Sequence, residues 1–161
     1  WLFGHSDGGS IALLHAAAFP DRVAGMVVCA PHLFVEELTV ASIERAREAY
    51  SSTDLRAKLA KYHDDPDSAF RGWNDIWLDP DFLAWNIERE VAIVRCPVLA
   101  VQGHDDPYGT MAQIERIATH LPAGQVELLK LDACGHSPHR DQPKVLIDRV
   151  VDFVHRRSGL D

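Results

Sequence analysis

The sequence predicts an α/β fold in which a parallel sheet is flanked by helices. Apolar runs at positions 2–5, 23–30, 98–101 and 126–131 have the length and composition of strands that helices cover on both faces. Segments with helical periodicity lie between these runs. Alternating strand and helix patterns are typical of parallel sheets with crossover helices.

The helices are expected where apolar residues recur at intervals of three or four. This pattern predicts a first helix at about 8–19, which Pro20 ends. It also predicts a helix that runs to about His120 and a third helix at 143–157. Small residues in the first helix (Gly9, Ala12 and Ala16) would let it lie close to the sheet.

Residues 33–90 differ from the rest of the chain because no strand pattern occurs in them. Two amphipathic stretches, near 38–50 and 55–62, precede an aromatic-rich segment. We therefore expect a helical lid inserted into a core that is formed by residues 1–32 and 91–161.

Composition limits the possible functions. The 161 residues carry a net charge of −8, which argues against a nucleic-acid or anionic membrane surface. No apolar stretch approaches the ~18 residues of a membrane span. The cysteines (Cys29, Cys96 and Cys134) are widely spaced, which favours a reducing, cytoplasmic location over a disulfide framework or zinc site. No cofactor or metal is expected.

The first residues, Trp1-Leu2-Phe3, have the apolar character of a buried strand. We therefore expect that an N-terminal segment of the same protein, cleaved or held as a separate chain, is a partner of this chain. The other expected partners are a small-molecule substrate and a second copy of the chain in a homodimer.

The turn Gly4-His5-Ser6-Asp7-Gly8 lies between a predicted strand and a predicted helix. In this context a Gly-x-Ser-x-Gly motif projects a nucleophilic serine above the sheet, and bulky residues at Gly4 or Gly8 would clash. The backbone N–H of Asp7, at the helix N-terminus, would face a developing oxyanion. The alternative is an ordinary glycine-rich turn.

A serine nucleophile requires a base, and His136 follows Gly135 just after a predicted strand. His139 is the competing base, although packing beneath the loop is the simpler role for it. A metal site made of the two histidines lacks a completing carboxylate or cysteine pattern.

The base in turn requires a carboxylate that fixes its tautomer and stabilises its cation. Asp105 and Asp106 both follow the predicted strand that ends near Gly103. Adjacent loop residues point in different directions, so both remain candidates on position alone.

The chain order Ser6, Asp106, His136, with Gly4-His5-Ser6-Asp7-Gly8-Gly9 and Gly103-x-x-Asp106, resembles the α/β-hydrolase superfamily. The Ser-Asp-Gly-Gly variant is similar to valacyclovir-hydrolase-like and other small serine esterases. The resemblance covers the C-terminal part of that fold, strands five to eight, with the lid between strands six and seven. It selects Asp106, because the family's acid commonly lies three residues after such a glycine.

The resemblance implies hydrolysis of a small carboxylic ester through an acyl-enzyme. The same triad also serves carbon–carbon bond hydrolysis, lactone hydrolysis and perhydrolysis, and a non-enzymatic hydrolase-like receptor is a further alternative. A second oxyanion donor usually comes from a loop after the family's third strand, which is expected outside these residues.

Four aromatic residues are candidates for substrate binding: Trp73, Trp77, Trp85 and Tyr108. The tryptophans would either line an apolar pocket over Ser6 or pack the lid against the core. Tyr108 follows the acid closely and has the same two interpretations.

Overall fold

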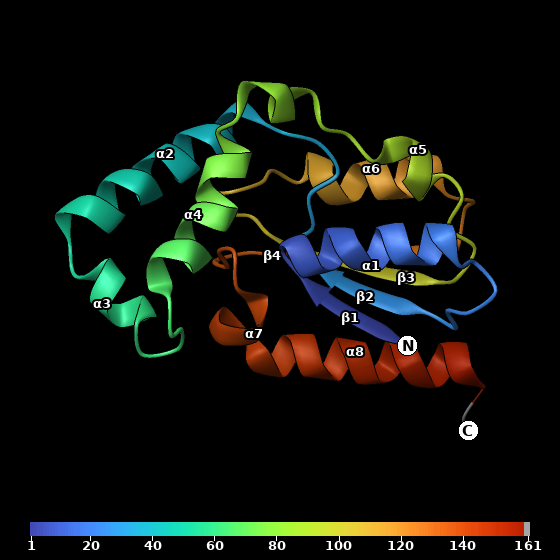
Figure 1. Ribbon diagram of the computed structural model, residues 1–161. Coiled ribbons are helices and arrows are strands. Elements are labelled where there is room, and N and C mark those ends of the chain that lie inside the picture. Colours follow the sequence, from blue (N-terminus) through green and yellow to red (C-terminus); the bar gives the residue numbers. More distant parts are fainter. Residues whose placement is uncertain (160–161) are drawn as a thin grey trace. The chain divides into compact units, whose positions relative to one another are not determined.

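The computed structural model describes residues 1–159, and the chain separates into two compact units (Figure 1). One unit contains Trp1–Phe34 together with the chain from Asn86 onward. The other unit is the continuous segment Val35–Trp85. We call these the sheet unit and the helical unit.

The sheet unit is built on four parallel strands in the order β1-β2-β3-β4. They are β1 (Leu2–His5), β2 (Met26–Cys29), β3 (Val98–Gly103) and β4 (Val126–Leu131). Their parallel register places all four carboxyl ends at one edge of the sheet. The predicted α/β class with a parallel sheet flanked by helices is thereby confirmed.

Helices cover both faces of this sheet. Figure 1 shows α1, α5 and α6 on one face and α8 on the other. The helices of the sheet unit are α1 (Asp7–Ala18), α5 (Glu88–Val91), α6 (Ala112–His120), α7 (Pro138–Asp141) and α8 (Pro143–Ser158).

The core between the sheet and α8 is aliphatic except for one aromatic ring and two thiols. It comprises Val27, Cys29, Leu99, Val101, Leu131, Cys134, Leu146 and Phe153. Alternate residues of β2 and β3 enter this cluster, as the period of two in a strand requires. On the opposite face the buried small residues Gly9, Ala12 and Ala16 let α1 lie close to the sheet.

The helical unit contains α2 (Glu37–Ser52), α3 (Leu55–Leu59), α4 (Pro66–Trp77) and a 3-10 helix, η1 (Pro80–Ala84). Tyr50 of α2 stacks on Phe70 of α4, with ring centroids 3.9 Å apart. The same tyrosine donates a 2.7 Å hydrogen bond to Asp67, which Arg56 also contacts. Rings and charge pairs therefore hold these helices together.

One predicted strand is longer than the strand in the structure. The apolar run 23–30 suggested a strand over its whole length, but β2 begins at Met26. Met26 is the residue that aligns with Leu2 of β1 and Val98 of β3, so the preceding residues have no strand partner. Within residues 1–159, no helix is long and apolar enough to cross a membrane.

Candidate active site

Ser6 occupies a strained backbone position between β1 and α1. Its φ of 55° and ψ of −127° lie in a region that residues with a side chain rarely adopt. The Ser6 N–H donates to the carbonyl of Cys29 at 2.9 Å, and its carbonyl accepts from the Gly9 N–H at 2.8 Å. These bonds tie the turn to β2 and to the first turn of the helix, which begins at Asp7.

The two glycines of the motif have different roles. A Cβ atom at Gly4 would lie 2.2 Å from the Gly8 carbonyl oxygen, so the turn requires glycine there. A Cβ atom at Gly8 would meet nothing within 4 Å. The expected clash at Gly8 was therefore wrong, because its α-carbon faces open space.

His136 lies in the loop after β4 and reaches both expected partners. Its Nε2 is 2.9 Å from Ser6 Oγ, and its Nδ1 is 2.9 and 3.0 Å from the two carboxylate oxygens of Asp106. An ionised carboxylate only accepts hydrogen bonds, so Nδ1 carries the proton in the neutral ring. Nε2 is then free to accept the Ser6 hydroxyl proton.

Several contacts fix the loop that carries His136. His5 Nε2 donates to the His136 carbonyl at 2.6 Å, and the Asp141 carboxylate accepts from the Gly135 N–H at 2.8 Å. A Cβ atom at Gly103 would lie 2.1 Å from the Cys134 carbonyl oxygen. Only glycine at the end of β3 therefore allows this close approach of the two loops.

Asp106 and Asp105 lie in different environments. Asp106 is buried, with its side chain 1% exposed, and it accepts hydrogen bonds from the Tyr108 N–H at 2.8 Å and from Gln102 Nε2 at 2.7 Å. Asp105 is exposed, and its N–H donates to the Cys134 carbonyl. The structure thus brings together Ser6, His136 and Asp106.

The competing base His139 is exposed on the short helix α7. Its ring lies 4.8 Å from that of His5, in an edge-to-face arrangement. Burial lowers the pKa of His5, and repulsion from a charged His136 or His139 lowers it further. His5 therefore favours the neutral form, whose single N–H supports the His136 loop.

The cysteines are free and buried. Burial raises the pKa of the Cys29 thiol to about 12 and also raises the pKa of Cys134, the cysteine nearest in sequence to His136. Both thiols remain protonated near neutral pH and act as small apolar core residues.

The candidate substrate-binding residues fall in both units. The Tyr108 ring lies 4.9 Å from the His136 ring. Within the helical unit, the Trp77 ring packs edge-on against Phe82 and Trp85 at 5.2 and 5.9 Å, and Trp73 contacts Phe70 at 5.7 Å. These ring contacts account for local packing, and the role of the tryptophans in substrate binding stays a prediction.

Sequence reasoning missed Gln102, which lies next to the end of β3 and contacts the acid. The signal was available, because a glutamine closes the otherwise aliphatic run Val98-Leu99-Ala100-Val101. A polar side chain at a buried strand position requires hydrogen-bond partners. A buried glutamine near the end of β3 therefore indicates a polar contact at the edge of the sheet where the carboxyl ends of the strands lie.

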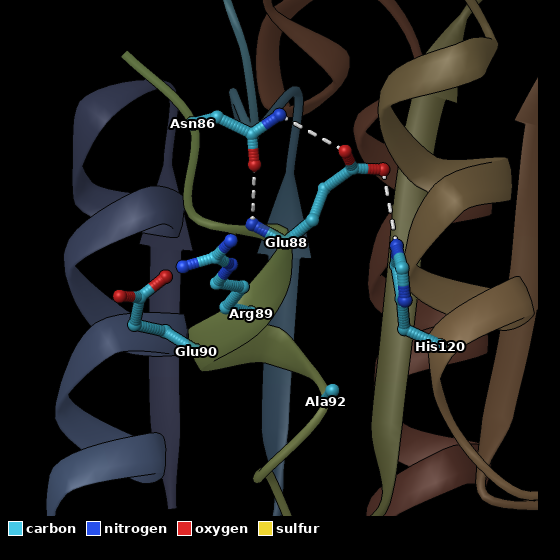
Figure 2. A pocket seen from close by; sticks show the side chains of 6 residues that line it. All are labelled: Asn86, Glu88, Arg89, Glu90, Ala92 and His120. Carbon is cyan, nitrogen blue, oxygen red and sulfur yellow. Dashed lines mark hydrogen bonds and ion pairs between the residues drawn. The ribbon is translucent and has the colours of Figure 1, made fainter.

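A second carboxylate–histidine pair lies in a surface pocket of the sheet unit. Figure 2 shows Glu88 between Asn86 and His120, with His120 Nε2 3.0 Å from the carboxylate. These hydrogen bonds lower the pKa of Glu88. Among the described residues that line this pocket, none is a serine or a cysteine. Among residues 1–159, no cluster of three or more His, Cys, Asp or Glu is placed to hold a metal ion.

The parallel sheet, the strained serine turn and the order of the loops define a chain of the α/β-hydrolase class. More particularly, it belongs to the family described as serine aminopeptidase, S33 (Hydrolase_4), whose model matches residues 1–143. A curated relative, "Putative esterase/lipase 2" of Mycoplasma pneumoniae, is 25% identical over 95% of this chain and 62% of its own length.

Solved structures share the fold. A meta-cleavage product hydrolase from Pseudomonas fluorescens IP01 superposes with a TM-score of 0.71 at 18% identity, over 96% of this chain and 64% of its own. The monoacylglycerol lipase of Paleococcus ferrophilus gives a TM-score of 0.63 at 20% identity, over 97% and 68%. The chain therefore spans less than two thirds of the length of the curated relative and of the first of these structures.

Proposed function

We propose that this chain carries the nucleophile, base and acid of a serine hydrolase that cleaves small carboxylic esters. The observation that carries the proposal is the continuous hydrogen-bonded series Ser6–His136–Asp106, which starts at a strained residue at the N-terminus of α1. Family membership and the name of the Mycoplasma pneumoniae relative support hydrolytic chemistry of this kind.

In the first half-reaction, Ser6 Oγ attacks the ester carbonyl carbon while His136 Nε2 takes the hydroxyl proton. Asp106 stabilises the resulting imidazolium through Nδ1. The negative charge that develops on the carbonyl oxygen faces the Asp7 N–H and the positive end of the α1 dipole. His136 then protonates the departing alkoxide, which leaves an acyl group on Ser6.

In the second half-reaction, His136 removes a proton from water, and the hydroxide attacks the acyl carbon. The tetrahedral intermediate collapses, the acid product leaves, and Ser6 regains its proton from His136. Tyr108, whose ring lies 4.9 Å from that of His136, is our candidate for contact with the leaving group or the incoming water. The tryptophans Trp73, Trp77 and Trp85 are our candidates for the apolar surface that receives the acyl chain.

Cleavage of an amide bond is a second candidate, because the family description names a serine aminopeptidase. The two chemistries share the nucleophile and the base, and differ in the protonation of the leaving group. Parallel assays with a short p-nitrophenyl ester and an aminoacyl p-nitroanilide would separate them. Turnover of the anilide at a rate comparable to that of the ester would favour the peptidase.

The direct test is ester hydrolysis by the intact protein and by its Ser6→Ala variant. We expect Ser6→Ala to lower kcat by roughly 10⁶-fold, because the attacking atom is removed. Ser10→Ala is the matched control, since Ser10 lies in the first turn of α1, four residues after Ser6, and its hydroxyl donates to the His32 carbonyl at 2.7 Å. Equal rates for the wild type and Ser6→Ala would exclude Ser6 as nucleophile.

A further inference from the structure

We propose that Gln102 is a positioning residue that holds the Asp106 carboxylate in the plane required by His136. The inference rests on the proposed function and deepens it. Gln102 lies near the end of β3, four residues before the acid, and its side chain is buried. The side chain donates hydrogen bonds to Asp106 and to the Gly109 carbonyl, so its influence on His136 passes through Asp106.

Both amide hydrogens of Gln102 are used within the loop that carries the acid. Nε2 donates to Asp106 Oδ2 at 2.7 Å and to the Gly109 carbonyl at 3.0 Å. Both partners are acceptors, so the amide nitrogen and not the amide oxygen must face them. One side chain thus joins the end of β3 to two points of the following loop.

The carboxylate of Asp106 is held from two sides. Gln102 Nε2 binds Oδ2, while the Tyr108 N–H binds Oδ1 at 2.8 Å. His136 Nδ1 is almost equidistant from both oxygens, at 2.9 and 3.0 Å. Without Gln102, Oδ2 would lose the hydrogen bond that it accepts from the amide, and the carboxylate could then rotate away from this symmetric position.

The amide is also an unusual residue for its place in the strand. The preceding four residues of β3 are aliphatic and fully buried, and the polar Gln102 is buried to the same degree, with 1% exposure. Its Oε1 atom is buried without a hydrogen-bond partner among residues 1–159. An apolar side chain of similar shape would remove that unpaired acceptor, so its effect on stability should be modest while the support of the acid is lost.

Methionine is the variant that matches glutamine in length and lacks the donor. We expect Gln102→Met to lower kcat about 10- to 100-fold in ester hydrolysis with KM little changed, because misplacement of the base affects the chemical step. The control is Gln125→Met at the opposite edge of the sheet. Gln125 Nε2 also donates to two acceptors, the carbonyls of Val94 and Cys96. This variant should retain the wild-type kcat.

A double-mutant cycle separates positioning from a general structural effect. In an Asp106→Ala background there is no carboxylate to orient, so Gln102→Met should cause no further loss of kcat. The same 10- to 100-fold loss in both backgrounds, or a wild-type kcat for Gln102→Met, would overturn the assignment.

A spectroscopic measurement tests the proposal independently of turnover. The His136 Nδ1 proton, bonded to a carboxylate, should give a low-field proton resonance that moves or disappears in Gln102→Met and stays unchanged in Gln125→Met. An unchanged resonance in Gln102→Met would contradict the inference. Failure of the proposed function has a different signature, namely no Ser6-dependent turnover in the wild type.

Discussion

The two edges of the sheet differ in how much backbone strain and buried polarity they contain. Among residues 1–159, the residues other than glycine with positive φ are Ser6, Ala30 and Ala133, with values of 55°, 48° and 48°. All three follow the carboxyl ends of strands. At the amino edge, positive φ occurs before β4 at Gly124, where glycine adopts it without strain.

The buried polar contacts follow the same division. At the carboxyl edge, Gln102 and Asp106 are buried and contact each other. At the amino edge, Gln125 is only partly buried and donates to backbone carbonyls. Strain and buried polar groups are costly, and they are concentrated where the side chains of three loops converge. The carboxyl edge therefore has the features expected of a reactive site.

The largest expected effect contrasts two histidines, each bonded to a carboxylate. His136 is bonded to Asp106 at the carboxyl edge, whereas His120 ends α6 and is bonded to Glu88 toward the amino edge (Figure 2). We expect His136→Gln to lower kcat by roughly 10⁶-fold, because the general base is lost. His120→Gln should leave kcat unchanged in the same ester assay. A comparable loss in both variants would contradict the functional difference between the edges.

A smaller effect concerns stability. Ala133 is exposed with φ 48°, a conformation that costs alanine about 1–2 kcal/mol and costs glycine little. We expect Ala133→Gly to raise the free energy of unfolding by about 0.5–1 kcal/mol after the entropy cost of glycine is subtracted. Denaturant unfolding measures this change.

Ala92 supplies the matched control for that substitution. It is exposed, follows α5 and has an ordinary helical φ of −61°. Ala92→Gly should therefore lower the free energy of unfolding by roughly 0.5–1 kcal/mol. A loss of stability in both variants would mean that the backbone at Ala133 is not strained.

The smallest effect concerns an ion network near the amino end of β4. Arg156 and Arg157 donate to Glu127 and lower its pKa. A lowered carboxyl pKa adds stability above the unfolded-state value, near 4.3, and this contribution is lost as the pH falls through the folded-state pKa. Glu127→Gln should thus lower the free energy of unfolding at pH 7 by less than about 1 kcal/mol, with a correspondingly small decrease in Tm. The difference between variant and wild type should decrease as the pH falls below about 4.3; a constant difference would exclude this charge effect.

Much of the sheet could be predicted from the sequence, because strands buried on both faces have continuous apolar composition. The bounds of β1 and β4 agree with the predicted segments, and β3 extends two residues beyond its apolar run. Strand pairing, which determined the start of β2, depends on residues far apart in the sequence and has no local signal. Apolarity also did not identify the buried face of α8, where Ile147 and Val151 are 59% and 48% exposed while Phe153 is buried.

The candidate active site could also be predicted only in part from the sequence. Motif and chain order pointed to Ser6 and His136, and the resemblance selected Asp106 over Asp105. The contacts that support these residues, such as His5 with the His136 carbonyl and Gln102 with the acid, join separate loops. Such contacts follow from the tertiary fold, and only the unusual polarity of Gln102 in its strand indicated one of them.

The most direct test of the central claim is covalent labelling with a fluorophosphonate probe, followed by mapping of the modified residue by peptide mass spectrometry. A serine activated by His136 attacks the phosphorus and displaces fluoride, which leaves a stable adduct on Oγ. The account predicts a single adduct on Ser6 that is absent from Ser6→Ala and strongly slowed in His136→Gln. Absence of labelling in the wild type, or an adduct on any other residue, would contradict it.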